Sequence, residues 1–445
     1  MKLTLIKPTI GRMTHSLYVD EARMEPLNLG VLAALTPEDV DVVMYDDRME
    51  PIPYQDPTDL VAITVETYTA RRSYEIADEY RRRGVRVIMG GFQPTFVPDE
   101  CAAHADSIFI GDAETAWATV IEDARRGELK PRYHALPGRP QTGVMTRRDI
   151  YKGKGYLPIS LLQFSRGCRF VCDFCAVTKY FDKKHYLRAI DETLAEVADA
   201  DHRLLFFVDD NIASNRSALK ELCRALIPMR VNWVSQASLD ITSDREAMKL
   251  MVDAGCLGHI MGFESITHAS IKEAKKSPNM PKFDQYATQI RILREYGLQT
   301  WAAFTLGYDH DTLDSVRATL DFALENRFTF AAFNILMPYP NTPLYERLAR
   351  EGRHLYDGQW WLHPKYRFND ASFVPARMTA DELTAVCYEA RQAFNRIPAL
   401  LWRFSDLKTN MRTLRRMSTF WRFNPVFRRE VFKKHGMLFG HFRHC

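Results

Sequence analysis

Three cysteines stand close together near the middle of the chain, at a spacing that suits metal chemistry. Cys168, Cys172 and Cys175 form a C-x3-C-x2-C pattern within eight residues. Their thiolates are soft ligands that favour iron–sulfur clusters and zinc. Three protein ligands leave one iron of a [4Fe–4S] cluster open, and an open iron can hold a chelating substrate. Two alternatives stay open: a zinc site completed by His185, and three unrelated core cysteines.

The elements around these cysteines predict a parallel barrel. Between residues 156 and 340, six short apolar runs each precede a polar turn and a helical stretch, and the first run ends just before Cys168. This βα rhythm favours a partial (β/α)6 TIM-like barrel, in which chemistry gathers at the carboxyl ends of the strands. The predicted strands are Ile159–Phe164, Leu204–Val208, Val231–Ser235, His259–Gly262, Thr300–Leu306 and Ala331–Leu336.

Residues 1–135 show the same alternation in shorter units, which predicts a Rossmann-like, doubly wound parallel sheet. Such sheets bind ligands beyond the carboxyl ends of their strands. The candidate loops are Thr64–Thr67, Gly90–Gly91 and Gly111–Glu114, although ordinary tight turns explain the same residues without a ligand. A linker follows over residues 136–155, and residues 341–445 predict a helical, basic C-terminal region.

The C-terminal segment carries a strong positive charge. The segment from Arg396 to Cys445 contains twelve Lys and Arg residues and two Asp and Glu residues, a net charge of +10. The whole chain carries +4. Aromatic residues such as Trp402 and Trp421 are interleaved with them. An interfacial helix on anionic lipid fits this pattern, and so does a helical cap on the barrel with a solvated charged face. Nucleic acid is not expected as a partner, because base-stacking sites usually carry their aromatic residues on a sheet.

The composition excludes several classes of protein. Of the 445 residues, 46% are hydrophobic and 26% are charged, as in ordinary globular chains. No apolar run reaches the roughly eighteen residues of a transmembrane helix, and the charged start does not resemble a signal peptide. Eight cysteines in so long a chain do not suggest a secreted disulfide framework. We expect a cytoplasmic protein, associated with the membrane periphery only if the tail contacts lipid, in which case a lipid-like substrate is favoured.

The cysteine motif resembles the signature of the radical S-adenosylmethionine (SAM) superfamily, because the aromatic Phe174 precedes its last cysteine. The resemblance implies that Cys168, Cys172 and Cys175 bind a [4Fe–4S] cluster and that its open iron chelates SAM. An external low-potential donor then supplies the electron that cleaves SAM to methionine and a 5′-deoxyadenosyl radical.

Other strand ends match this superfamily more loosely. The resemblance implies that Asp209 and Asp210 hold the methionine amine of SAM, and a carboxylate is suited to accept from an ammonium. It also implies polar contacts of Gln236 and Glu264 with SAM. The alternative for each of these residues is an ordinary helix cap or a solvated turn.

The front domain resembles the cobalamin-binding domain that precedes many radical SAM modules. Segments 26–35, 90–95 and 111–114 stand in the order that this family shows. The residues to which the resemblance assigns cobalamin contacts are Thr64, Thr67, Gly90, Gly91, Gly111, Asp112 and Glu114. No Asp-x-His-x-x-Gly motif occurs in the chain, so a bound cobalt is expected without a histidine lower ligand.

Together the two resemblances imply a cobalamin-dependent, class B radical SAM methyltransferase. One SAM would methylate cobalt, and the radical from a second SAM would activate a carbon of a small-molecule substrate that then takes the methyl group from methylcobalamin. Relatives of this architecture also carry out cyclisation, hydroxylation or rearrangement, so non-methyl chemistry is an alternative. A non-enzymatic protein with a zinc site and a nucleic-acid-binding tail is an alternative of another class.

Overall fold

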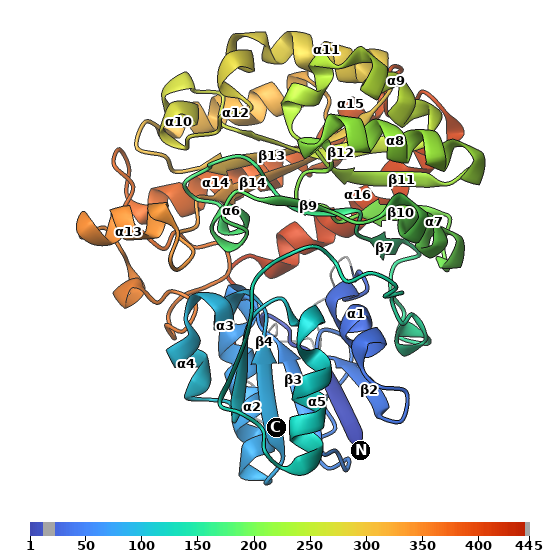
Figure 1. Ribbon diagram of the computed structural model, residues 1–445. Coiled ribbons are helices and arrows are strands. Elements are labelled where there is room, and N and C mark those ends of the chain that lie inside the picture. Colours follow the sequence, from blue (N-terminus) through green and yellow to red (C-terminus); the bar gives the residue numbers. More distant parts are fainter. Residues whose placement is uncertain (12–22, 441–445) are drawn as a thin grey trace. The chain divides into compact units, whose positions relative to one another are not determined.

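The computed structural model describes residues 1–11 and 23–440 of the chain, whose helices and strands are drawn in Figure 1. The chain divides into two compact units. Unit 1 comprises residues 1–157, 356–368 and 436–445, and unit 2 comprises residues 158–355 and 369–435. The predicted C-terminal region, residues 341–445, therefore contributes to both units, and its last five residues, 441–445, lie outside the described part.

Unit 1 is built on a six-stranded sheet with the order β2-β1-β3-β4-β5-β6, and every neighbouring pair is parallel. Its strands are β1 (Lys2–Lys7), β2 (Asp41–Asp46), β3 (Leu60–Thr64), β4 (Arg86–Gly90), β5 (Ser107–Gly111) and β6 (Arg132–Ala135). The strand order reverses between β1 and β3, and in open parallel sheets this is the usual place for a ligand. The predicted Rossmann-like, doubly wound sheet is confirmed.

Helices cover both faces of this sheet. Helices α1 (Leu27–Leu35) and α5 (Trp117–Arg126) share one core with alternate strand residues such as Leu3, Leu5 and Leu60. On the opposite face, α2 (Ala70–Arg82) packs against β3 and β4. The short helices α3 (Phe92–Phe96) and α4 (Pro98–Ala102) connect β4 to β5. Strand residues are buried on both faces, which explains the continuous apolar runs of the sequence.

A buried ion pair holds the end of β2. The Asp47 side chain is fully buried, and its two oxygens accept hydrogen bonds from Arg72 Nε and Nη2, each at 2.8 Å. Such bidentate pairs combine charge with fixed geometry. Loss of the carboxylate charge would leave the Arg72 guanidinium in a dry environment without its main counter-charge.

We predict that Asp47→Asn destabilises the protein by about 3–5 kcal/mol, because it breaks this buried pair. Urea unfolding of the full-length chain measures the change. The matched control is Asp39→Asn, which breaks the exposed pair with Arg125 and should cost less than about 1 kcal/mol. Equal losses of unfolding free energy in the two variants would contradict the stabilising role of the buried Asp47–Arg72 pair.

Unit 2 contains a second parallel sheet of six strands, with the order β14-β13-β12-β11-β10-β7. The strands are β7 (Ser160–Leu162), β10 (Leu204–Phe207), β11 (Asn232–Gln236), β12 (Cys256–Glu264), β13 (Gln299–Leu306) and β14 (Phe330–Ile335). Strands β7 and β14 are the two edges of the sheet, so the barrel is partial. The predicted (β/α)6 architecture is confirmed, and all six predicted strands are present.

The helices between these strands form an outer layer. Figure 1 shows α8 to α12 above the strands of this sheet. They are α7 (Ile190–Asp199), α8 (Arg216–Leu226), α9 (Arg245–Asp253), α10 (His268–Glu273), α11 (Tyr286–Glu295) and α12 (Leu313–Glu325). Several begin at a side-chain cap: Asn215, Asp244 and Thr312 each accept a backbone N–H of the first turn. Such caps fix where a helix begins after a strand, so they help to define the carboxyl edge of the sheet.

The C-terminal part of unit 2 is helical, as predicted. It consists of α13 (Pro343–Arg350), α14 (Ala380–Phe394), α15 (Ile397–Phe404) and α16 (Leu414–Lys434). Arg403 of α15 is fully buried and donates to the backbone oxygens of Thr329 at 2.6 Å and Phe394 at 3.2 Å, which ties α15 to the barrel and to α14. In the parts of the chain that the structure describes, no helix is both long and apolar enough to cross a membrane.

Candidate active site

The three predicted cluster ligands share one loop beyond the end of β7. The loop lies between β8 (Ser165–Gly167) and β9 (His185–Leu187), an antiparallel pair, and its last cysteine is the N-cap of α6 (Ala176–Tyr180). Cys172 is buried, while Cys168 and Cys175 are half-buried. Within residues 1–11 and 23–440, no three His, Cys, Asp or Glu side chains are positioned to hold a single metal ion. A [4Fe–4S] cluster binds its thiolates on different irons, so its ligands need not meet at one point.

Binding to iron would deprotonate thiols that burial otherwise keeps protonated, and an amide donor lies near one of them. Burial raises the pKa of the Cys172 thiol to about 12, and it also raises the pKa of Cys175, with Thr178 opposing that shift. Asn211 Nδ2 lies 4.0 Å from Cys168 Sγ. Metal binding requires deprotonated thiols, and nearby hydrogen-bond donors stabilise the thiolates that result.

Asp209 and Asp210 hold the backbone that enters the cysteine loop. Asp209, just beyond β10, is fully buried and accepts hydrogen bonds from Phe164 N at 3.1 Å, from Ser165 N at 2.5 Å and from the Ser165 hydroxyl. Asp210 Oδ2 accepts from Gly167 N at 2.7 Å. Burial raises the pKa of Asp209 to about 7. Both oxygens of Asp209 are thus engaged by the protein itself, and both aspartates position the segment just before Cys168.

Glu264 lies at the end of β12 beside a lysine that the motif analysis missed. Lys276 Nζ donates to Glu264 Oε1 at 2.7 Å, and the Thr305 hydroxyl donates to Oε2 at 2.7 Å. Burial alone would lower the pKa of Lys276, but the charges of Glu264, Cys172 and Cys175 outweigh it and raise that pKa. A charged, largely buried ammonium therefore lies close enough to Cys172 and Cys175 for their charges to interact.

The backbone at Glu264 is strained in a way that points to function. Its φ is +64°, in the left-handed region that residues other than glycine rarely adopt. The buried Asn279 supports this turn, because its Nδ2 donates to the carbonyl oxygens of Gly262 at 2.9 Å and Phe263 at 3.0 Å. Strained backbones of this kind cluster at binding sites, where the surrounding structure maintains them.

Two buried polar atoms beside the loop lack a partner among the described residues. They are Asp173 Oδ1, between Cys172 and Cys175 in sequence, and the hydroxyl of Tyr308. The Tyr308 ring meets Phe174 edge-on, with centroids 6.4 Å apart, so the aromatic residue of the motif packs in this layer. Gln236 is half-buried at the end of β11. Unsatisfied buried polar atoms are rare in native proteins, and here they suit a polar ligand next to the thiols.

His259 lies in the first half of β12, away from the carboxyl end of the strand, and its side chain is part of the core. It is buried, and its ring nitrogens contact Ser235 Oγ at 2.9 Å and Cys256 Sγ at 3.4 Å. Burial lowers its pKa to about 4. The unfolded chain, with a pKa of about 6.5, binds a proton that the folded chain excludes. This contribution to stability is complete above about pH 6.5 and is lost as the pH falls toward 4.

We predict that His259→Gln reduces the acid sensitivity of the protein. Between pH 6.5 and pH 5, this histidine should cost the wild type about 2 kcal/mol of unfolding free energy, a loss that the neutral amide avoids. Urea unfolding at the two pH values measures how steeply the free energy of unfolding changes with pH. The control is His310→Gln, at an exposed position, which should keep the pH dependence of the wild type. An unchanged slope in His259→Gln would refute the prediction.

In unit 1, the residues predicted to bind cobalamin lie at the carboxyl edge of the parallel sheet. Thr64 ends β3 and its hydroxyl accepts from Asn28 Nδ2 at 2.7 Å, while Thr67 is buried in the turn that follows. Gly90 ends the adjacent strand β4, and Gly111 ends β5, next to β4. Lys7, at the end of β1, pairs with Glu66 at 2.6 Å across the position where the strand order reverses. Asp112 accepts from Gly138 N at 3.0 Å, and Glu114 lies in the turn before α5.

The glycines at this edge have different roles. A Cβ at Gly91 would lie 2.7 Å from Val65 O, and one at Gly111 would lie 1.7 Å from Ala135 O; both residues also have positive φ. These two glycines are required by the fold itself. A Cβ at Gly90 would meet only Phe109 Cβ, at 3.7 Å. The absent side chain at Gly90 therefore leaves space at the carboxyl edge, which fits a large ligand lying over the strand ends.

Comparison with known proteins identifies the family. Residues 162–323 match the model of the radical SAM superfamily. The structure aligns with that of TsrM from Kitasatospora setae, a radical S-adenosylmethionine methyltransferase, with a TM-score of 0.62, 18% identity, and coverage of 79% of this chain and 76% of that one. It aligns with the cobalamin-dependent S-adenosylmethionine radical enzyme OxsB with a TM-score of 0.63, 14% identity, and coverage of 97% and 71%. These two likenesses show the shared fold.

Two proteins of Chlorobaculum tepidum are similar in sequence along most of their length. Bacteriochlorophyllide d C-12(1)-methyltransferase is 29% identical over 86% of this chain and 84% of its own length. Bacteriochlorophyllide d C-8(2)-methyltransferase is 31% identical over 75% of this chain and 78% of its own length. The chain therefore belongs to the radical SAM superfamily and, within it, to the class B radical SAM methyltransferases.

Proposed function

We propose that this enzyme methylates an unactivated carbon of a small molecule, with cobalamin held by unit 1 and a [4Fe–4S] cluster and SAM held by unit 2. The observation that carries the proposal is the cysteine loop, in which three thiols lie beyond the end of a barrel strand and beside the buried cation of Lys276. Chemistry in barrels of this kind gathers at that edge.

In unit 2, Cys168, Cys172 and Cys175 bind the cluster. When bound, the cluster supplies one electron to SAM, which yields methionine and a 5′-deoxyadenosyl radical for hydrogen abstraction from the substrate. The chain contributes position and charge. Asp209 and Asp210 hold the loop backbone, and Phe174 packs the loop against Tyr308. Gln236, Glu264 and Lys276 present polar groups to SAM, with the Lys276 ammonium suited to its carboxylate.

In unit 1, the carboxyl edge of the sheet binds cobalamin through Thr64, Thr67, Gly90, Gly91 and the Gly111–Glu114 turn. Cobalamin, when bound, supplies a cobalt that relays the methyl group of SAM to the substrate carbon. The chain has no Asp-x-His-x-x-Gly motif, which supports a cobalt without a histidine lower ligand.

Cobalamin binding is tested by retention of hydroxocobalamin on the full-length protein, measured by absorbance after gel filtration. We expect Gly90→Ala to fold and to weaken retention, because its Cβ enters the space over the strand ends. Gly84→Ala is the control, since a Cβ there meets nothing within 4 Å and Gly84 lies in the turn before β4, at the opposite edge of the sheet. A wild-type protein that retains no cobalamin would refute this part of the proposal.

The first substrate to test is bacteriochlorophyllide d, on which both Chlorobaculum relatives act by name. The holoenzyme is incubated with SAM that carries an isotope-labelled methyl group and with a low-potential reductant. We expect the label in a carbon–methyl group of the product. If 5′-deoxyadenosine forms and the product carries no label, the enzyme performs a non-methyl reaction on this substrate and the proposal fails.

The reaction needs an external low-potential electron donor, and the cysteine loop is accessible to one. Val171, between Cys168 and Cys172, is 41% exposed. The exposed charged residues nearest in sequence are mostly basic. The four basic ones are Arg169, Lys179, Lys183 and Lys184, and the acidic one is Asp182. This balance favours a donor with an acidic surface.

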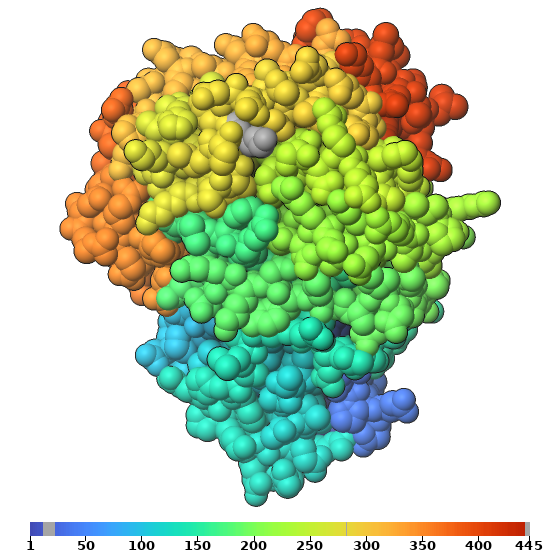
Figure 2. Space-filling model, turned by 45° about the horizontal axis from the view of Figure 1, so that its top comes forward, coloured from blue at the N-terminus to red at the C-terminus, as the bar shows by residue number. Residues whose placement is uncertain are grey.

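We also propose that the C-terminal helices contact an anionic membrane surface. Large apolar side chains are exposed within residues 397–414, which contribute to the red surface of Figure 2: Ile397, Leu401, Trp402, Leu407 and Leu414. From residue 396 to 434 every exposed charged residue is basic, because Asp406 is buried and Glu430 is half-buried. Exposed apolar groups among basic ones suit the interface of an anionic bilayer.

Vesicle flotation tests this contact. We expect the protein to float with phosphatidylglycerol vesicles, and the double variant Leu407→Glu/Leu414→Glu to stay in the soluble fraction. These positions are 73% and 84% exposed, so the substitutions should not disturb folding. The matched control is Val374→Glu, at an exposed apolar position outside the helices. Equal flotation of all three proteins, or none of the wild type, would refute the contact.

A further inference from the structure

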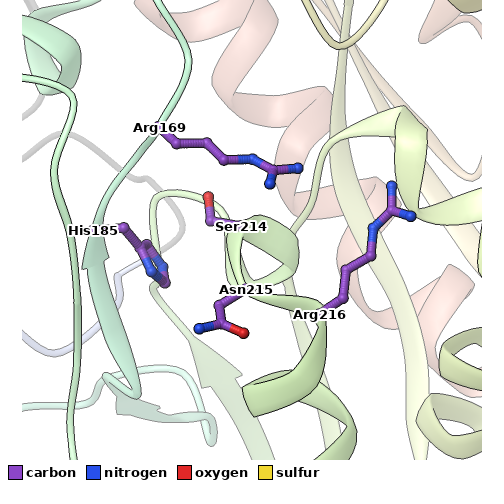
Figure 3. A pocket seen from close by; sticks show the side chains of 5 residues that line it. All are labelled: Arg169, His185, Ser214, Asn215 and Arg216. Carbon is purple, nitrogen blue, oxygen red and sulfur yellow. The ribbon is translucent and has the colours of Figure 1, made fainter.

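A polar pocket lies beside the cysteine loop and contains none of the residues that the proposed function assigns to the cluster, SAM or cobalamin. It has a volume of about 650 Å³ and is lined by Arg169, His185, Ser214, Asn215 and Arg216. Figure 3 shows these side chains around one space. Arg169 comes from the cysteine loop and His185 from β9, and the other three come from the turn before α8 and its first residue. The pocket is therefore built by two segments of unit 2 that meet at the carboxyl edge of the sheet.

The pocket contains polar atoms that have no partner among the described residues. Ser214 is 6% exposed, and its hydroxyl is buried without a hydrogen bond. His185 Nε2 and Arg216 Nε are also buried and unpartnered. Leaving a buried polar group unsatisfied costs about 1–3 kcal/mol. Three such atoms on one pocket indicate that a ligand supplies their hydrogen bonds.

The charge of the pocket selects the ligand. Arg169 and Arg216 are both directed to the carboxylate of Asp240, at 3.5 Å and 2.8 Å, so two guanidinium groups share one internal anion. Asn215 caps α8 by accepting from Ala218 N at 3.1 Å, and the partial positive charge of the helix N-terminus adds to that of the arginines. A serine hydroxyl and two arginines at a helix start match the chemistry of oxyanion recognition.

We propose that this pocket binds the carboxylate or phosphate group of a small molecule. Arg169 and Arg216 pair with the oxyanion, and the Ser214 hydroxyl donates to one of its oxygens. Because Arg169 directly follows Cys168 in the chain, the bound acid group lies next to the cysteine loop. The site therefore selects acidic small molecules at the catalytic edge of unit 2.

The test uses full-length, cluster-loaded protein with inorganic phosphate and acetate as separate probes. Each anion is titrated at constant ionic strength, and the apparent dissociation constant is taken from the logarithmic rise of the stabilisation with anion concentration. We expect saturable binding of one or both anions, and the anion that binds more tightly identifies the preferred class. Ser214→Ala should raise the dissociation constant at least tenfold. The anion-free stability should not fall, because the hydroxyl has no partner in the protein.

Matched variants on the same helix separate binding from general effects. Arg216→Gln should weaken binding as Ser214→Ala does. Ser217→Ala and Arg224→Gln should bind as the wild type does, since Ser217 is exposed and Arg224 pairs with Glu246 away from the pocket. A midpoint that rises linearly with anion concentration, or equally in all variants, reflects salt exclusion from the surface and overturns the proposal. Saturable binding that Ser214→Ala leaves unchanged overturns it as well.

Discussion

Cys172→Ala is expected to abolish formation of 5′-deoxyadenosine. Cys172 is the only one of the three cysteines that is buried as a residue, and the positive charge of Lys276 acts to lower the pKa of its thiol. Removal of one ligand exposes a second iron, and a three-ligand cluster has no spare protein ligand to replace it. We expect bound iron to fall to a small fraction of the wild-type content, and 5′-deoxyadenosine to fall by at least a hundredfold.

The control for this variant is another buried cysteine of unit 2. Cys223 is fully buried in α8, and its substitution by alanine removes a similar volume from the core. Cys223→Ala should therefore lower stability by about 1 kcal/mol and keep its iron and its activity. If Cys172→Ala forms 5′-deoxyadenosine as well as Cys223→Ala does, the assignment of the cluster ligands is wrong.

Lys276→Met should have the second largest effect, in both stability and SAM binding. The substitution leaves Glu264 buried without its cation, which should cost about 3–5 kcal/mol. It also removes the positive charge next to the thiols, so we expect the dissociation constant of SAM to rise at least tenfold. Equilibrium dialysis with labelled SAM on the cluster-loaded protein measures the second effect.

Two further variants separate these effects. The double variant Glu264→Gln/Lys276→Met removes both charges of the buried pair, so it should regain most of the lost stability while SAM binding stays weak. Lys272→Met, at an exposed position of α10, should match the wild type in both measurements. If Lys276→Met binds SAM with the affinity of the wild type, Lys276 is not part of the SAM-binding site and its role is structural only.

Local patterns were sufficient to predict the two parallel sheets. The strands of unit 2 appear as apolar runs because most of their residues are buried or half-buried, and the predicted first strand ends shortly before the cysteine segment. The short strand β6 was not predicted, because Arg132 and His134 are exposed and only Tyr133 is buried. Its parallel partner β5 precedes it by about twenty residues, and local periodicity carries no information on such pairings.

The return of the chain to unit 1 was also beyond local reasoning. Residues 356–368 fold with unit 1, where Trp360 and Trp361 are buried and Trp361 Nε1 donates to Glu100 Oε1 at 3.0 Å. The partners of this bond are separated by 261 residues. A tryptophan pair in a polar segment indicates burial, but only the tertiary structure shows against which unit.

Within the site, the motif predicted the thiols, and the tertiary contacts revealed the rest. Lys276 follows Glu264 by twelve residues, past a helix and a turn, so no helical or strand spacing links the two residues. Asp209 stands at a strand end where a ligand contact is implied, yet both of its oxygens bind Phe164 and Ser165. Which polar groups at a strand end face a ligand depends on the loops that fold over it, and sequence spacing does not contain that information.

Electron paramagnetic resonance of the reduced, anaerobically rebuilt protein, recorded with and without SAM, tests the open-iron assignment most directly. We predict the spectrum of a reduced [4Fe–4S] cluster that changes in shape when SAM is added, because the amino and carboxylate groups of SAM occupy the iron that the three cysteines leave vacant. A protein that stays colourless and iron-free after rebuilding, or a cluster spectrum that SAM leaves unaltered, would contradict the account.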